Sequence, residues 1–248
     1  MLLPKFTKRA YLFNIIAFVG LVVALGMIFF YAPNERTMGY VQRLFYFHVG
    51  SAWVASITFS VALVCGAIYL WKPQPHLDAL SLASVEIGVV FIMMTIISGS
   101  VWGKPAWNTW WLWSPRLTSI TILWLVYIAY FMLRGALDDV EKKRRFSAVY
   151  VIAAFVTVII TYGSIRILRD IHPIMFGGAL ESAQGAEQGL QEFSGLDSLR
   201  MVVTLNVTVL AFSLLYVAWL ANRIRIEGMK NMSQQAKMRL IAKFADGR

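Results

Sequence analysis

Residues 11–31 have the sequence YLFNIIAFVGLVVALGMIFFY, an uncharged apolar segment long enough to cross the hydrocarbon core of a membrane as a helix. Basic residues precede this segment, as they do in a signal peptide. However, the segment is too long for the hydrophobic region of a signal peptide, and no small-residue cleavage site follows it. We therefore expect it to be retained as a transmembrane helix.

Five further apolar segments of roughly 20 residues follow along the chain. Composition agrees with a membrane protein, because 58% of the residues are hydrophobic and 15% are charged, against about a quarter charged in ordinary soluble domains. We predict an all-α, polytopic integral membrane protein that forms a single membrane domain over residues 1–248. Its six transmembrane helices are expected at approximately residues 11–31, 47–71, 80–101, 119–137, 146–166 and 199–221.

Charge gives the expected orientation. A net charge of +10 would suggest nucleic-acid binding in a soluble protein, but in a membrane protein Lys and Arg concentrate in cytoplasmic segments, so no nucleic-acid partner is expected. With the N-terminus inside, sixteen of the 23 Lys and Arg residues lie in cytoplasmic segments. We therefore predict that both termini are cytoplasmic, with outer loops at 102–118 and 167–198. The cytoplasmic tail, 222–248, is basic and its spacing allows a helix on the membrane surface.

Five of the nine tryptophans lie in the outer loop 102–118, WGKPAWNTWWLWSPRLT. Three of them, spaced i, i+3 and i+4, would share one face of a helix. An interfacial aromatic belt is the simpler explanation, but a belt supplies about one or two tryptophans at a helix end. The density favours a platform for a flat, partly charged ligand such as haem, whose propionates could pair with Arg116 or Lys104. The five platform residues are Trp102, Trp107, Trp110, Trp111 and Trp113.

Two of the three histidines lie on the same predicted face as the tryptophans. His48 is at the outer start of the second span, and His172 follows the outer end of the fifth. Imidazole is a common axial ligand of haem iron, so the two could bind one iron from opposite sides. Each histidine alone is more simply a polar interfacial residue. The third, His76, is expected in a solvated loop on the cytoplasmic side.

Other motifs limit the functional classes. The single cysteine, Cys65, and the absence of CxxCH exclude covalent haem attachment to this chain. The sequence has no Walker A motif, no HExxH and no nucleophile with a plausible base, so we do not expect an enzyme. Glu86 is the only acidic residue well inside a predicted span, and we assign it no role. A transport permease with Glu86 on its substrate path is an alternative function.

The sequence resembles the haem-handling membrane proteins that carry the tryptophan-rich WWD signature and, among them, the CcmC family of cytochrome c maturation. The resemblance covers about residues 30–220. Ser114 stands where the signature has its aspartate, so we expect the loop to lose an orienting hydrogen bond. The matching residues are Trp102–Gly103, Trp107, Trp110–Trp111, Trp113, Arg116–Leu117–Thr118 and the segments that end in His48 and His172.

The resemblance implies a bacterial inner-membrane protein that holds haem b without a covalent bond on the outer, periplasmic face. His48 and His172 would be the axial ligands, and Arg116 would lie beside the tryptophan platform. It also implies that the chain presents haem to the haem chaperone CcmE and works with the ABC transporter subunits CcmA and CcmB and the small membrane protein CcmD. The related CcsA-type haem delivery proteins share the signature, but they usually have more spans and more histidines.

Overall fold

The computed structural model describes residues 8–36, 38–167, 172, 196 and 198–246. Throughout these residues the regular elements are helices, as predicted. Two short turns separate the first two long helices: the π-helical turn η1 (Met27–Tyr31) and the 3₁₀ turn η2 (Tyr40–Gln42). The long helices are α1 (Lys8–Gly26), α2 (Arg43–Trp71), α3 (Pro75–Trp107), α4 (Pro115–Ala136), α5 (Val140–Ile167) and α6 (Leu199–Asp246).

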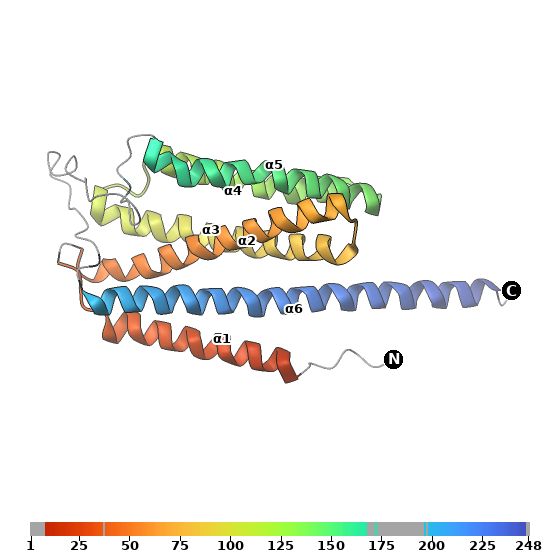
Figure 1. The fold of residues 1–248 in the computed structure, drawn as a ribbon, viewed down its shortest axis with the longest axis horizontal. Coiled ribbons are helices and arrows are strands. Elements are labelled where there is room, and N and C mark those ends of the chain that lie inside the picture. The colour runs from red at the N-terminus through yellow and green to blue at the C-terminus, as the bar shows by residue number, and fades with distance from the viewer. Residues whose placement is uncertain (1–7, 37, 168–171, 173–195, 197, 247–248) are drawn as a thin grey trace.

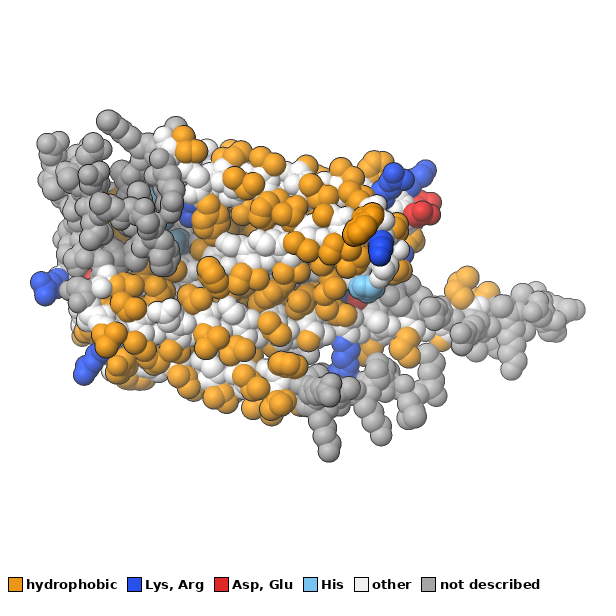
Figure 2. All heavy atoms as spheres, viewed as in Figure 1, with side chains coloured by type: hydrophobic (Ala, Val, Ile, Leu, Met, Phe, Trp, Pro, Cys, Tyr) orange, Lys and Arg blue, Asp and Glu red, His pale blue; other side chains and the backbone are white. Residues whose placement is uncertain are grey.

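Six segments are long and apolar enough to span a membrane, which confirms the predicted fold class. Hydrophobic side chains cover the length of the bundle in Figure 2, and the visible Lys and Arg side chains gather toward its two ends. This distribution is typical of helices whose outer faces contact lipid.

The helices lie side by side in pairs (Figure 1). Helix α1 packs on α6, α6 packs on α2 and α3, and α4 and α5 form a pair that closes over α2 and α3. We call the end of the bundle at which residues 108–114 join α3 to α4 the tryptophan end. The starts of α2, α4 and α6 also lie there, so the described parts of the predicted outer segments meet at one end of the molecule. Most of the predicted outer loop 167–198 lies outside the described residues.

Close helix contacts depend on glycines. A Cβ at Gly88 of α3 would lie 2.4 Å from Thr58 Oγ1 and 2.7 Å from a ring carbon of Phe59 on α2. A Cβ at Gly66 of α2 would lie 2.7 Å from Val151 Cγ2 on α5. Membrane helices associate through such close packing, because lipid tails remove most of the hydrophobic driving force between them.

We expect Gly88→Ala to destabilise the bundle by about 1–3 kcal/mol, because the added methyl group must separate α2 from α3 or displace buried side chains. The matched control is Gly135→Ala near the end of α4, where a Cβ meets no atom within 4 Å. This control should be neutral or slightly stabilising, since alanine is favoured over glycine in helices. Thermal unfolding in detergent measures both variants, and equal melting temperatures would contradict the close α2–α3 contact.

Glu86 contacts a helix that is distant in sequence. Its carboxylate accepts two hydrogen bonds from Arg223 of α6, at 2.5 Å to Nε and 2.9 Å to Nη2. Arg223 also donates to Glu227 one turn later, at 2.9 Å. Ionisable side chains inside a membrane domain are expected to pair with one another. The pair therefore accounts for Glu86 as a contact between α3 and α6.

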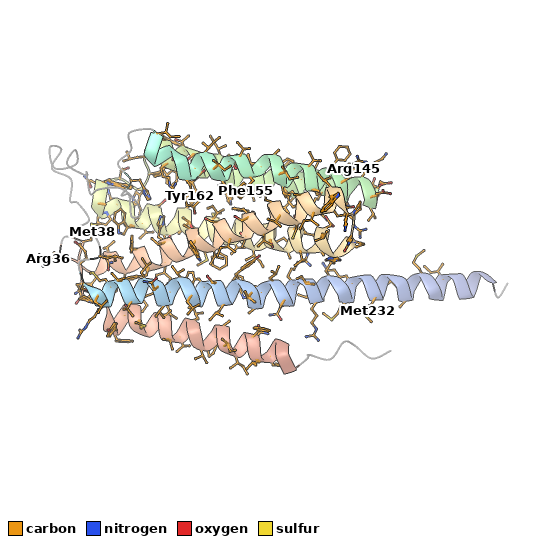
Figure 3. The ribbon with its side chains drawn as sticks, in the orientation of Figure 1. Arg36, Met38, Arg145, Phe155, Tyr162 and Met232 are labelled. Carbon is orange, nitrogen blue, oxygen red and sulfur yellow. The ribbon has the colours of Figure 1, made fainter. Side chains whose placement is uncertain are left out.

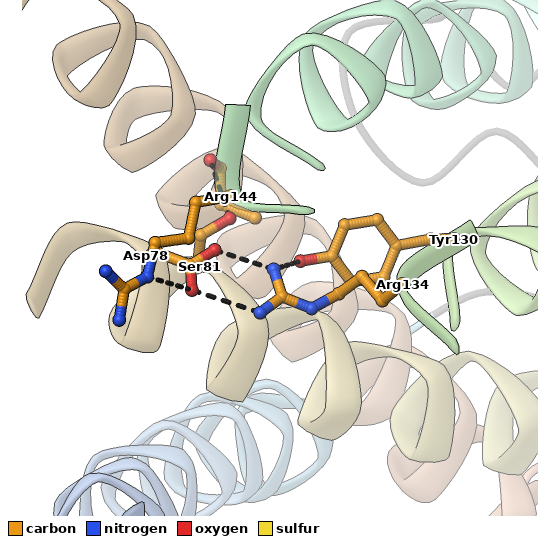
Figure 4. Close-up of polar contacts among 6 residues, drawn as sticks. Asp78, Ser81, Tyr130, Arg134 and Arg144 are labelled. Carbon is orange, nitrogen blue, oxygen red and sulfur yellow. Dashed lines mark hydrogen bonds and ion pairs between the residues drawn. The ribbon is translucent and has the colours of Figure 1, made fainter. Parts of the chain in front are cut away.

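A second ionic cluster lies at the end opposite the tryptophan end (Figure 4). Asp78 of α3 accepts hydrogen bonds of 2.6 and 3.0 Å from Arg134 of α4, and its carboxylate lies 3.7 Å from Arg144 Nε on α5. Arg134 also donates to the hydroxyl of Tyr130 at 3.3 Å. The Asp78 and Arg134 side chains are only 11% and 13% exposed. The cluster thus joins three helices with a largely buried, bidentate pair.

Several helix boundaries differ from the prediction. The stretch 102–118 is only partly a loop, because α3 continues to Trp107 and α4 begins at Pro115. His76 is exposed as expected, but it lies in the first turn of α3 instead of a loop. The tail is a direct continuation of α6, whose 48 residues form a helix on the order of 70 Å long. It projects beyond the other helices, past Met232, in line with its span (Figures 1 and 3).

Candidate functional site

His48 is held by the neighbouring helix. It lies in the second turn of α2, with Nδ1 3.0 Å from the backbone carbonyl oxygen of Thr95 on α3. A carbonyl oxygen can only accept, so Nδ1 carries the proton in this contact. Nε2 is then left with its lone pair, which is the form of imidazole that binds a metal. Metal-binding histidines are commonly oriented by such a bond from their other ring nitrogen.

The His172 ring lies close to the His48 ring. The centres of the two imidazole rings are 6.1 Å apart and the ring planes meet at 37°. Two imidazoles bound to one metal ion from opposite sides have their centres on the order of 6 Å apart, because each metal–nitrogen bond is about 2 Å. The structure thus brings together two histidines that are far apart in sequence, at a spacing that fits axial ligands of one iron.

A cavity opens beside the two histidines, bounded by α2, α3, α4 and α5. It holds about 990 Å³ of space free of protein atoms, part of it open to the surroundings. Phe59 lines it and is stacked on Tyr127 of α4 at 3.8 Å between ring centres. Apolar walls come from Ala52, Ala55, Ile92, Ile120, Leu123 and Val158.

Three of the five tryptophans line this cavity: Trp102, Trp107 and Trp111. Trp102 is 8% exposed and meets Trp107 edge to face, with ring centres 5.6 Å apart. The Trp107 ring folds back over Gly103, where a Cβ would lie 3.1 Å from it. These three aromatic side chains therefore contribute to the lining of the cavity beside the histidines.

Trp110 and Trp113 are 59% and 73% exposed and do not line the cavity. The prediction that Trp107, Trp110 and Trp111 share a helical face was wrong, because α3 ends at Trp107. Asn108 terminates the helix with a left-handed φ of 54°, and Lys104 Nζ donates to its carbonyl oxygen at 3.0 Å. Binding roles for Trp110 and Trp113 stay predictions.

Ser114 begins α4. Its Oγ accepts a hydrogen bond from Leu117 N at 3.5 Å, and Pro115 occupies the first helical turn. Serine before proline is a favourable helix start, because the serine oxygen satisfies an otherwise free N–H group. Ser114 thus caps the start of α4, and the effect of the missing signature aspartate on the loop stays a prediction.

Arg116 lies in the first turn of α4 and lines the cavity. Its Nη1 donates to the carbonyl oxygen of Thr161 on α5, and its guanidinium lies 4.8 Å from the ring centre of Tyr162. Tyr162 in turn donates to the carbonyl oxygen of Ala52 on α2 at 3.1 Å. Among the described residues that line the cavity, Arg116 carries a positive charge, and through Tyr162 it is part of a link between α4, α5 and α2.

Sequence reasoning missed several residues of the site. Thr95 acts through a backbone carbonyl, which any residue carries, so no sequence signal could have identified it. Gly99 and Tyr162 line the cavity as ordinary members of apolar spans. Their importance depends on which helices are neighbours, and only the fold gives that.

Comparison with known proteins shows the family to which this chain belongs. The model of the family CcmC, heme exporter protein C, matches residues 3–239. The chain belongs to the CcmC family. CcmC relatives include the heme exporter protein C of Paracoccus denitrificans, 30% identical over 89% of this chain and 88% of the relative, and that of Rhodobacter capsulatus, 28% identical over 90% of each. A putative cytochrome c biosynthesis ccmC-like mitochondrial protein of Marchantia polymorpha is 27% identical over 60% of this chain and 63% of the relative.

Proposed function

We propose that this chain binds haem for cytochrome c maturation in the cavity at the tryptophan end. The pairing of His48 with His172 beside an aromatic cavity is the observation that carries the proposal. Haem b is held without a covalent bond, and the two imidazoles bind its iron as axial ligands. Arg116, together with the tryptophan-lined wall, suits a flat ligand that has both an apolar ring and carboxylates.

The proposed role is delivery and not bond formation. The chain sits in the bacterial inner membrane with the tryptophan end on the outer face, and it presents haem to the chaperone CcmE. CcmA, CcmB and CcmD are its proposed membrane partners. Membership of the CcmC family and the printed names of the relatives support haem handling in cytochrome c biosynthesis. An opening of the cavity to the surroundings supports access for a partner.

Transfer of haem to purified CcmE tests this function. The full chain, purified in detergent and loaded with haem, is expected to transfer haem to CcmE, where haem staining of a denaturing gel detects the covalent product. His76→Ala is the matched control for substitutions of His48 and His172. His76 is exposed on the first turn of α3, at the opposite end of the bundle. This control should transfer as the unaltered chain does. A chain that shows no Soret band, or that binds haem and never loads CcmE, would contradict the proposal.

A further inference from the structure

The imidazole of His48 lies directly against the backbone of α3. A Cβ placed on Gly99 would be 2.9 Å from His48 Cε1 and 3.2 Å from Nδ1. Real Cβ atoms essentially never approach another atom to less than 3.0 Å, so a side chain at position 99 requires the ring to move from its present position. The ring occupies the space that any residue other than glycine would fill.

The same turn of α3 also supplies the hydrogen bond to His48. Thr95 lies one turn before Gly99, and its carbonyl oxygen accepts from Nδ1. The hydroxyl of Thr95 is directed elsewhere, because it donates to the carbonyl oxygen of Phe91 at 2.9 Å. Ser98 Oγ is 3.4 Å from Nδ1, but it makes a shorter bond of 2.6 Å to Met94 O. The contact with the Thr95 carbonyl is therefore the one that orients the ring.

We infer that Gly99 is a positioning residue for His48. Its missing side chain lets the imidazole approach α3 closely enough for Nδ1 to reach the Thr95 carbonyl oxygen. That bond fixes the proton on Nδ1 and leaves the lone pair on Nε2 for a metal. The consequence for haem rests on the proposed function, whereas the tautomer and position of the ring follow from the chain's own contacts.

Gly99→Ala is expected to displace the ring and break the Nδ1 contact while leaving His48 in the sequence. Loss of the outer hydrogen-bond partner of a metal-binding histidine typically lowers metal affinity 10–100-fold, and we expect a change of that size in haem affinity. The helix itself should tolerate the change, because alanine is a better helix former than glycine. Ser98→Ala should have a smaller effect, since it removes a weaker contact and adds no atom.

Nitrogen NMR of the haem-free chain tests the inference without haem. The chain contains three histidines, so after ¹⁵N-histidine labelling the signals lost in His48→Ala identify the His48 ring. In the unaltered chain and in Gly135→Ala, His48 should be a single tautomer with the proton on Nδ1. In Gly99→Ala it should show the other tautomer or a mixture of the two. Ring signals unchanged by Gly99→Ala would overturn the inference.

Haem titration, followed through the Soret band, gives the second measurement. Haem affinity reduced 10–100-fold in Gly99→Ala, with the affinity of Gly135→Ala unchanged, supports the inference. Equal haem affinity in the unaltered chain and in Gly99→Ala overturns the inference that Gly99 supports haem binding through His48. A chain without any haem binding would instead refute the proposed function, and the NMR comparison would still decide how Gly99 positions His48.

Discussion

Replacing either His48 or His172 with alanine is expected to lower haem affinity by about 100-fold or more. Even the loss of a hydrogen-bond partner behind a metal ligand costs 10–100-fold, and removal of the ligand itself should cost more. The ring centres lie 6.1 Å apart, so the remaining imidazole would bind the iron from one side only. Haem titration of the purified chain, with the position and intensity of the Soret band recorded, measures the change.

His76→Ala is again the control and should retain the affinity of the unaltered chain. The pairing of the two histidines predicts that the single variants lose affinity to a similar degree. It also predicts a change from the spectrum of six-coordinate to that of five-coordinate haem in each variant. Loss of affinity with one substitution alone would show a single axial histidine and would contradict the paired arrangement.

Asp78→Ala is expected to destabilise the fold by on the order of 3–5 kcal/mol. Its side chain and that of Arg134 are 11% and 13% exposed, so the substitution leaves the arginine charge buried without its carboxylate. The substitution also removes the carboxylate that joins the three helices, because Asp78 accepts hydrogen bonds from Arg134 of α4 and lies beside Arg144 of α5. The midpoint of thermal unfolding in detergent should fall by several degrees or more.

Asp138→Ala is the matched control for this substitution. Asp138 lies between α4 and α5 at the same end of the bundle, but it is exposed, and surface positions of this kind usually change stability by less than about 0.5 kcal/mol. Because Asp78 lies far from the tryptophan end, haem affinity measured well below the melting temperature should not change. Equal melting temperatures for the two variants would contradict a stabilising role for the buried pair.

The membrane fold could be predicted from sequence because each span is a long apolar segment that can be recognised from its own residues. An apolar segment such as residues 11–31 has one stable state in lipid, a helix that satisfies its own backbone hydrogen bonds. Helix ends were harder to predict, because aromatic and charged residues continue a helix beyond its apolar part. Two examples are the extension of α3 to Trp107 and that of α6 to Asp246. In both, the prediction ended the helix where hydropathy fell.

The site could be predicted in part, because residue chemistry was visible and contacts were not. Histidines and tryptophans are rare enough that their coincidence at one predicted face was informative. The structure shows which of the tryptophans line the cavity. Trp111 lines it and Trp110 does not, although the two are adjacent in sequence. That difference depends on the left-handed turn at Asn108, which a helical spacing rule cannot foresee. Glycine contacts such as that of Gly99 with His48 have no local signal at all.

The separation of His48 from His172 along the chain determines when the site can first exist. The two rings meet only after α3, α4 and α5 have been made and have packed beside α2. At synthesis rates of about 5–20 residues per second, His172 leaves the ribosome's active centre roughly 6–25 s after His48. During that interval a nascent chain carries one of the two histidines and an incomplete cavity. Completion of the fifth helix and the residues just after it is therefore the step at which the chain acquires both histidines of its site.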